Sequence, residues 1–253
     1  QHYDWGDPTF IPDLFQLPSN SQPWAEMWFG THPSGPSRLD TADGPLLSDD
    51  IGEMTMLVKI LACTSPLSLQ THPTRQQAER GFARENTAGI PLTDPKRVYK
   101  DPSDKPELLI ALTEFEALCG FDTIEASIDR LQQIGWREEA DVLDQNGIDG
   151  YLLWAFDQRT TPSMSAVPGW MSRLSDAYPT DRALRVAPLL HHIVLQPGQA
   201  ISLPAGNLHA YLHGAGIEVM ASSDNVVRAG FTTKHVDVAE LLRIVDTSPL
   251  EHP

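Results

Sequence analysis

Short apolar runs separated by turn residues recur along most of the chain. Three have the length of single strands, and a fourth, longer stretch is divided by a Pro-Gly turn: MLVKILA (56–62), LSLQTH (67–72), ELLIAL (107–112) and HHIVLQPGQAISLPAG (191–206). Many of the 21 prolines and 17 glycines fall between such runs. Short strands joined by tight turns are typical of sandwiches and barrels. We therefore expect a mainly β fold, a jelly-roll β-barrel or sandwich.

The pattern changes between residues 122 and 185, where apolar residues recur at helical spacing. In DTIEASIDRLQQIG (122–135), they stand at positions 124, 128, 131 and 134. Asp122 and Glu125 have the spacing of a capping box, which would start this helix. We predict that residues 122–185 form a helical insertion domain and that residues 1–121 and 186–253 form one discontinuous β domain.

Capping pairs predict two further helices. Thr74 and Gln77 would start one directly after the THP of residues 71–73, and Asp237 and Glu240 would start the other. The second is followed by an apolar stripe typical of a helix packed on one side. The acidic stretch LSDDIGEM (47–54) is expected to be a loop.

The charge balance excludes some classes of partner. The formal net charge is −16, and binding to nucleic acid or to anionic membranes depends on an excess of Lys and Arg. There is no run of 18 apolar residues and no basic-then-apolar start typical of a secretory signal. We expect a cytoplasmic monomer that binds neither nucleic acid nor membranes. Cys63 and Cys119 lie in apolar stretches and are expected to be buried thiols.

Polar side chains alternate with leucines in LSLQTHP (67–73). In a strand, Ser68, Gln70 and His72 share one face, while Leu67 and Leu69 take the other. An antiparallel sheet with one face in water would give the same alternation. The run by itself therefore leaves open whether this face carries a site.

Three other stretches favour a site. Lys105 and Glu107 lead directly into a strand, and a carboxylate is costly to bury there without a cation. The turn before LHAYL delivers His209 and Tyr211 to one face of the next strand. Isolated charges follow among small and apolar residues, at Glu218, Asp224, Arg228 and Lys234.

Four of these side chains suit a divalent metal ion. Gln70, His72, Glu107 and His209 offer two imidazoles, a carboxylate and an amide oxygen. Imidazole and carboxylate are ordinary ligands of Zn²⁺. The same set leaves Fe²⁺, Mn²⁺ and Co²⁺ open, because metal selection also depends on geometry and availability.

Long segments of the chain resemble type I phosphomannose isomerases, the mannose-6-phosphate isomerases of the cupin superfamily. The resemblance rests on YDWG (3–6), PWAEMWFGTHPSGPS (23–37), LVKIL (57–61), LSLQTHP (67–73), YKDPSDKPELLIALTEFEALCGF (99–121) and LPAGNLHAYLHGAGIEVMASSDNVVRAGFTTKHVDV (203–238). It implies a cupin fold and the zinc-dependent interconversion of mannose 6-phosphate and fructose 6-phosphate. It also implies one Zn²⁺ on Gln70, His72, Glu107 and His209, the same four residues.

The resemblance places further family positions and shows two departures. The family's conserved arginine falls on Arg228, and its lysines fall on Lys59 and Lys234. The family usually has Asn-His before Lys-Pro-Glu, whereas this chain has Ser103 and Asp104, so any role of that histidine would pass elsewhere. The family also continues into a second cupin-like domain. Because this chain starts at Gln1 without a methionine and stops near residue 253, we expect it to lack that domain, either as a naturally short form or as a fragment of a longer protein.

These residues lead to a hypothesis for an isomerase that passes through a cis-enediol. We assign the general base to Lys59, whose pKa an apolar strand would lower, with Lys105, Asp224 and Glu218 as proton shuttles. Arg228 and Lys234 would bind the phosphate. Ser68, Tyr211 and Trp5 are further candidate substrate contacts, and Trp28 could also line the cleft.

Three alternatives stay open at this point. Lys59 could be a structural ion-pair partner. The chain could be a cupin of another chemistry, such as an iron-dependent oxygenase, which needs no phosphate-binding cations. It could also be a sugar-phosphate-binding cupin that keeps its metal without turnover.

Overall fold

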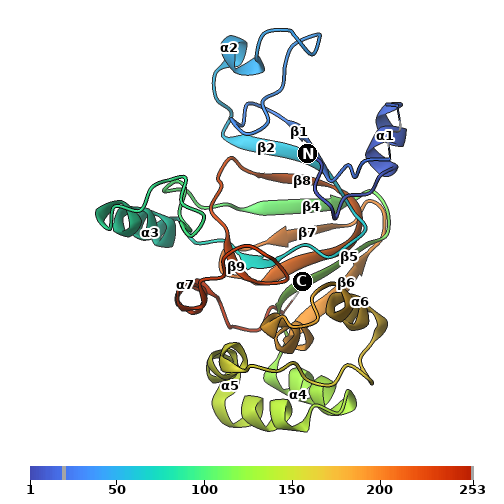
Figure 1. Ribbon diagram of the computed structural model, residues 1–253, viewed down its shortest axis with the longest axis vertical. Helices are drawn as coiled ribbons and strands as arrows, with labels where there is room; N and C mark the ends of the chain where they lie inside the picture. Colours follow the sequence, from blue (N-terminus) through green and yellow to red (C-terminus); the bar gives the residue numbers. More distant parts are fainter. Residues whose placement is uncertain (19–20, 252–253) are drawn as a thin grey trace.

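Two antiparallel β-sheets form the centre of the protein, whose computed structural model describes residues 1–18 and 21–251 (Figure 1). Five strands make up the first sheet, in the spatial order β1 (Glu26–Phe29), β2 (Met56–Cys63), β8 (His209–Ala221), β4 (Glu107–Ala111) and β7 (Ala200–Leu203). The neighbouring pairs in this sheet are all antiparallel.

The second sheet uses the first half of the same long strand, β8. Its order is β9 (Val227–Gly230), β3 (Leu69–Thr71), β8, β5 (Phe115–Phe121) and β6 (Leu190–Leu195). The change of sheet falls at Gly214, whose φ is 114°. A Cβ there would lie 2.4 Å from the carbonyl oxygen of Glu114, so the bend requires a glycine.

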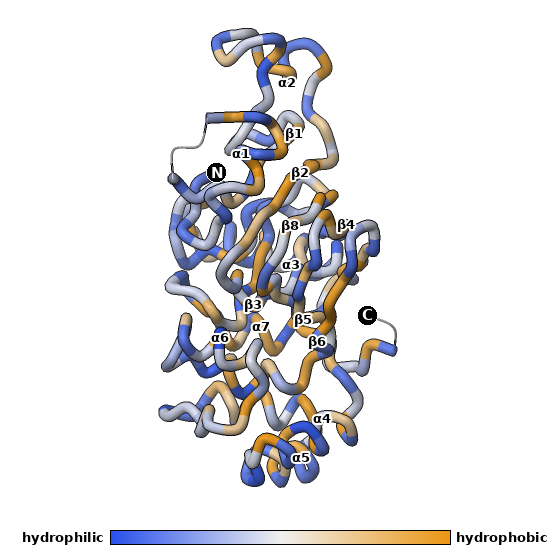
Figure 2. Tube along the Cα trace, turned by 90° about the vertical axis from the view of Figure 1, so that its right-hand side faces the viewer, coloured by the Kyte–Doolittle hydropathy of each residue, from blue (hydrophilic) through white to orange (hydrophobic). Residues whose placement is uncertain are grey.

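Apolar side chains of the two sheets meet between them. On β4, Glu107, Leu109 and Ala111 are buried while Leu108 is exposed, as expected for a strand with one face inward. Leu61 and Phe115 belong to the same buried cluster. Hydrophobic residues run along strands such as β2 in Figure 2. The predicted mainly β architecture is confirmed.

The predicted helical character between residues 122 and 185 is also confirmed. This part contains α4 (Ile124–Gln133), α5 (Arg137–Asp157), α6 (Gly169–Ala177) and the 3₁₀ turn η1 (Arg182–Arg185), and η2 (Ala187–Leu189) leads into β6. These helices lie at one end of the sheets (Figure 1). They share one hydrophobic cluster with sheet residues such as Leu69, Leu118 and Val227. The division into two domains therefore stays a prediction.

The start of α4 differs from the prediction by one residue. Thr123, not Asp122, is the N-cap, and its side chain accepts a hydrogen bond from the backbone N–H of Ala126. The Asp122 carboxylate instead accepts from the Thr123 backbone and pairs with Arg130 at 2.5 Å. A tertiary ion pair thus takes the carboxylate that the local pattern assigned to the cap.

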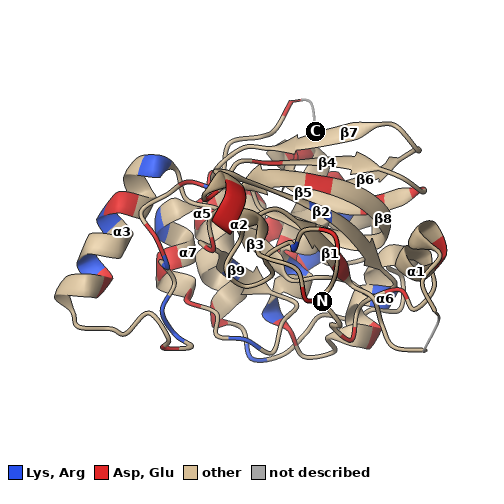
Figure 3. Ribbon diagram, turned by 90° about the horizontal axis from the view of Figure 1, so that it is seen from above, with Lys and Arg blue, Asp and Glu red and all other residues tan. Residues whose placement is uncertain are grey.

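The remaining helices are α1 (Phe10–Phe15), α2 (Leu47–Ile51), α3 (Arg75–Thr87) and α7 (Val238–Ile244). The capping box of Thr74 and Gln77 at α3 is confirmed, and so is Asp237 as the N-cap of α7. Glu240, by contrast, does not complete a capping box, because its buried carboxylate contacts Tyr99, Arg84 and Arg243. The loop expected at 47–54 contains the short helix α2, whose charged residues are all acidic (Figure 3).

Two other expectations concern single features. Cys63 and Cys119 are free and buried, as predicted. Within residues 1–18 and 21–251, no helix combines the length and apolar character needed to cross a membrane.

The contact between α3 and Tyr99 leads to a stability prediction. A Cβ on Gly81 would lie 2.2 Å from the ring of Tyr99, which is fully buried and donates its hydroxyl to Glu240 at 2.5 Å. We expect Gly81→Ala to lower the free energy of unfolding by about 1–3 kcal/mol, because the ring cannot move without breaking that bond. Chemical denaturation measures the change. Gly169→Ala is the control, since only one atom lies within 4 Å of its Cβ; equal losses in both variants would contradict the prediction.

Candidate functional site

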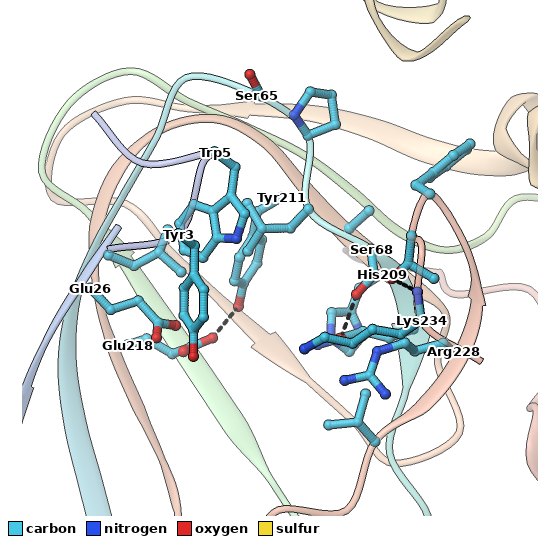
Figure 4. A pocket seen from close by; sticks show the side chains of 18 of the residues that line it. Tyr3, Trp5, Glu26, Ser65, Ser68, His209, Tyr211, Glu218, Arg228 and Lys234 are labelled. Atoms are coloured by element: carbon cyan, nitrogen blue, oxygen red, sulfur yellow. Dashed lines mark hydrogen bonds between the residues drawn. The ribbon is translucent and has the colours of Figure 1, made fainter. Parts of the chain in front are cut away.

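A cavity of about 630 Å³ opens between the two sheets, and most of the predicted site residues line it. Its wall draws on β1, β2, β3, β4, β8 and β9, on the N-terminal segment and on residues 232–234. Figure 4 shows Tyr3, Trp5, Glu26 and Glu218 at one end and His209, Arg228 and Lys234 at the other. The predicted residues in the wall are Trp5, Trp28, Lys59, Ser68, Gln70, Lys105, Glu107, His209, Tyr211, Glu218, Asp224, Arg228 and Lys234. His72 lies buried behind it.

Three of the four predicted metal ligands come together at one end of this cavity. Nε2 of His72 lies 3.2 Å from one oxygen of Glu107, and Nε2 of His209 lies 3.5 Å from the other. All three candidate ligand atoms are within 4.8 Å of one another, and all three residues are buried. Ligands about 2.0–2.2 Å from a tetrahedral zinc ion have comparable separations.

Hydrogen bonds orient both imidazoles for metal binding. Nδ1 of His72 is 2.8 Å from the carbonyl oxygen of Asn225, and Nδ1 of His209 is 3.1 Å from that of Asn207. A carbonyl only accepts, so each Nδ1 carries the proton and each Nε2 is turned toward Glu107. Burial lowers the pKa of His72 despite the nearby Glu107, which keeps its Nε2 unprotonated near neutral pH.

The buried polar atoms that face one another in this cluster do not form hydrogen bonds. Among the described residues, Nε2 of His72, Nε2 of His209 and both oxygens of Glu107 make no hydrogen bond. Burial alone would raise the pKa of Glu107, but His72 and Lys105 outweigh it and hold this pKa well below its usual range. Lys105 Nζ lies 3.0 Å from Glu107 Oε1. Two nitrogen lone pairs facing a carboxylate, with the Lys105 ammonium on one of its oxygens, fit a divalent cation.

Gln70 occupies the position between the metal ligands and the basic side chains. On β3 it stands opposite His209 of β8 on one side and opposite Arg228 of β9 on the other. Its amide oxygen accepts a hydrogen bond from Ser68 at 3.0 Å, so these two side chains share a face. The structure gives Gln70 a place beside the buried cluster, and its role as a ligand stays a prediction.

Arg228 and Lys234 differ from the other basic side chains of the cavity in their pairing. Among the described residues, neither forms an ion pair with a carboxylate, and Figure 4 shows them side by side at the cavity. Burial lowers the pKa of Arg228; burial and the neighbouring Arg228 lower the pKa of Lys234. Two partly buried cations in this arrangement favour an anion, and a guanidinium can bind phosphate through two donors.

The surroundings of Lys59 correct one expectation. Its Nζ lies 3.4 Å from Glu26, 3.7 Å from Glu218 and 4.7 Å from the centre of the Trp28 ring. Burial alone would lower the pKa of Lys59, but Glu218 and Glu26 outweigh it and raise this pKa. The predicted downward shift was wrong, because the flanking strands supply two carboxylates that the apolar sequence around Lys59 does not reveal.

The structure adds residues that the sequence patterns did not single out. Glu26 is one of them. His32 is another: its Nε2 lies 3.5 Å from Asp224, while its Nδ1 accepts from the Ser34 backbone at 3.2 Å. Both lie inside PWAEMWFGTHPSGPS, where the sequence signal was similarity to a family and not a periodic pattern.

Asn225 supports His72 from a loop far away in the sequence. Its carbonyl oxygen accepts from His72, and its side-chain amide donates to the carbonyl oxygens of Asp101 at 2.7 Å and Ser103 at 2.8 Å. Asp104, which replaces the family's usual histidine, is absent from the described cavity wall. It lies 3.9 Å from Arg75 at a partly exposed position.

Comparisons with known proteins agree with this geometry. A family model, phosphomannose isomerase type I, catalytic domain, matches residues 1–124. The mannose-6-phosphate isomerase of Salmonella typhimurium is 35% identical over 98% of this chain and 73% of its own length. That of Escherichia coli K12 is 36% identical over 96% of this chain and 72% of its own length.

Solved structures extend the similarity to the fold. A mannose 6-phosphate isomerase from Salmonella typhimurium, bound to its substrate and to zinc, matches with a TM-score of 0.86 at 32% identity. The match covers 99% of this chain and 73% of that one. A zinc-bound mannose 6-phosphate isomerase structure matches with a TM-score of 0.87 at 35% identity and the same coverage. The expected cupin fold is thereby confirmed.

The convergence of lone pairs on Glu107 gives a prediction about metal binding. We expect His209→Ala to bind zinc at least about 100-fold more weakly than the unmodified protein, because it removes a ligand and not merely a supporting contact. Zinc content after dialysis and competition with a chelator measure this loss. His213→Ala is the matched control, since His213 is an exposed residue of the same strand. Full zinc content in the His209 variant would refute the ligand set.

Proposed function

Because the chain belongs to the type I phosphomannose isomerase family, we propose that it interconverts mannose 6-phosphate and fructose 6-phosphate in the cavity between its two sheets. The observation that carries the proposal is the pairing of a buried metal-binding cluster with Arg228 and Lys234, two cations without an acidic partner among the described residues. The cluster suits the sugar oxygens, and the two cations suit the phosphate.

His72, Glu107 and His209 would hold one Zn²⁺ per chain, with Gln70 beside them as the fourth ligand. A zinc ion bound there would supply a Lewis acid for the oxygens of the sugar. Asn225 and Asn207 keep the two imidazoles in the tautomer that binding requires. Lys105 forms an ion pair with Glu107 and lines the cavity, where its ammonium can also meet a substrate oxygen.

Arg228 and Lys234 are the proposed phosphate-binding pair. Tyr211, Ser68 and Trp5 line the same cavity and are proposed substrate contacts. A sugar phosphate bound in this way would place its charged end beside β9 and its sugar along β8. Glu218 also lies on β8, beside the strand β4 that carries Glu107, so it would face the carbons whose oxygens lie near the metal site.

Glu218 is the group that we propose takes the proton between C2 and C1. Burial and the charge of Glu107 raise the pKa of Glu218 to about 7, where a carboxylate can accept a proton and return it near neutral pH. The carboxylate removes the proton from C2, the C–H electron pair forms the C1–C2 double bond, and the electron pair of the C1 carbonyl moves to its oxygen. That oxygen gains a proton and the C2 hydroxyl loses one, which gives the C2 carbonyl as the proton held by Glu218 returns to C1. Asp224, held near His32, is the second candidate for proton exchange.

This assignment gives Lys59 a different role from the base first expected. An ammonium paired with two carboxylates has no free lone pair with which to accept a proton. We propose that Lys59 contributes positive charge beside the developing enediolate. The monomeric state, the lack of nucleic-acid binding and the cytoplasmic location stay predictions.

A coupled assay with mannose 6-phosphate tests the proposed function. We expect turnover in the zinc-loaded protein, its loss after chelation and its return when zinc is restored, because the reaction needs the sugar oxygens to be polarised. Calorimetric titration with the same sugar phosphate runs in parallel. Binding without turnover would instead identify a sugar-phosphate-binding protein, and turnover that survives complete removal of the metal would refute the mechanism.

The Arg228 guanidinium in the cavity gives a prediction about specificity. We expect Arg228→Ala to keep its zinc and to lose roughly 10- to 100-fold in kcat/KM, the size of a lost charge-assisted hydrogen bond of about 1.5–3 kcal/mol. Activity on unphosphorylated mannose should change much less, since that sugar carries no anion for Arg228. Arg80→Ala, at an exposed position of α3, is the control. An equal loss on both sugars would argue against phosphate binding by Arg228.

A further inference from the structure

Glu26 belongs to a continuous network of donors and acceptors in the cavity wall. The Trp28 indole donates to one oxygen of Glu26 at 2.9 Å, and Lys59 donates to the other at 3.4 Å. Lys59 also lies 3.7 Å from Glu218, whose second oxygen accepts from the Tyr211 hydroxyl at 2.9 Å. Both oxygens of Glu26 are therefore engaged inside the protein.

The register of the strands places the side chains of this network next to one another. On neighbouring strands, Trp28 of β1 stands opposite Lys59 of β2, which in turn stands opposite Glu218 of β8. Side chains at opposed positions lie on the same face of a sheet, so all three point to the cavity side. Glu26, two residues before Trp28, points to that face as well. The arrangement follows from the sheet and does not depend on a mobile loop.

Because the side chains of this network are buried, the balance between their positive and negative charges is important. Glu26, Lys59 and Glu218 are 7%, 8% and 3% exposed. The groups that face Lys59 are Glu26 and Trp28 of β1, Glu218 of β8, Glu107 of β4 and Tyr3 of the N-terminal segment. Removing the Glu26 carboxylate would leave the Lys59 ammonium with one close carboxylate, that of Glu218, which is the proposed base.

We propose that Glu26 is a positioning residue of the isomerase, which holds the Lys59 ammonium against Trp28 and thereby leaves Glu218 free to exchange protons with the substrate. Without Glu26, Lys59 would move fully onto Glu218 and make it a poorer base. The inference deepens the proposed function and rests on it. Both oxygens of Glu26 already accept from donors of the protein, so we assign it a role through Lys59 and not a direct contact with the substrate.

The charge state of Lys59 can be measured directly in the zinc-loaded protein. The chain has only five lysines, so NMR of protein labelled with ¹³C at the lysine ε-carbon should resolve each side chain. The Lys59 signal is assigned by its absence in Lys59→Arg. We expect Lys59 to stay charged to a higher pH than an ordinary lysine, because Glu218 and Glu26 raise its pKa by more than burial lowers it. Titration below the ordinary lysine range would overturn the proposal, whatever the variants show.

Glu26→Gln tests the role of the carboxylate while keeping its shape. We expect the Lys59 titration to move to lower pH and the alkaline limb of the kcat/KM profile to move with it. At neutral pH, kcat should fall on the order of tenfold, with a smaller change in KM, because Glu26 does not touch the substrate. Glu26→Asp retains the charge and should restore the Lys59 titration toward that of the unmodified protein.

A matched surface variant separates the effect from a general loss of charge. Glu79→Gln removes a carboxylate that pairs with Arg75 at 2.9 Å on the exposed side of α3, and it should change neither measurement. A folded, zinc-loaded Glu26→Gln protein with unchanged Lys59 titration and unchanged pH profile would refute the role of Glu26. The NMR titration needs no turnover. Absence of isomerase activity in the unmodified protein would therefore count against the proposed function, while an unshifted Lys59 would count against this inference alone.

Discussion

The buried carboxylate of Glu107 is the constraint on which the rest of the site depends. It is 4% exposed and faces two imidazole nitrogens whose other ring nitrogens are already committed to carbonyl oxygens. Lys105 offsets part of its charge, but the converging nitrogen lone pairs still require a cation. A divalent ion bound there would satisfy all three groups at once, so it would stabilise the fold as well as supply chemistry. The loop that carries Lys105 and the loop that carries Asn225 are hydrogen-bonded to each other around this point.

The long strand β8 connects this metal-binding end with the end proposed for proton transfer. Its first half, in one sheet, carries His209 and Tyr211, and its second half, in the other sheet, carries Glu218. The bend at Gly214 allows one strand to serve both sheets, since a side chain there would collide with the backbone of Glu114. Tyr211 donates to Glu218 across that bend. One continuous element thus fixes the distance between the two halves of the cavity.

Basic residues make up a larger share of the charged residues in the cavity wall than in the molecule as a whole. Acidic residues outnumber basic ones by 34 to 18 in the whole chain, whereas the described cavity wall carries five acidic residues against four basic ones, Lys59, Lys105, Arg228 and Lys234. Two of them are paired with carboxylates, while Arg228 and Lys234 have no acidic partner among the described residues. In the proposed function, the paired cations would keep fixed charges near the reacting carbons, and the unpaired ones would bind the phosphate. A negative surface need not repel an anionic substrate when the local cations are concentrated and partly shielded from water.

The sequence by itself determined the mainly β architecture, the helical segment and the principal metal-binding triad. Alternation and helical spacing are local, and His72, Glu107 and His209 stand in segments whose polarity contrasts with their apolar neighbours. Only the tertiary structure decided the charge of Lys59, the N-cap residue of α4 and the contacts of the Glu240 carboxylate. Lys59 and Glu240 meet partners distant in the sequence, Glu26 with Glu218 and Tyr99 with Arg84. At α4, the partner of Asp122 is Arg130, eight residues further along and beyond the first turn. The physical reason is that a side chain's charge and hydrogen bonds depend on the groups within a few ångströms of it, and those groups are brought there by strand register and packing.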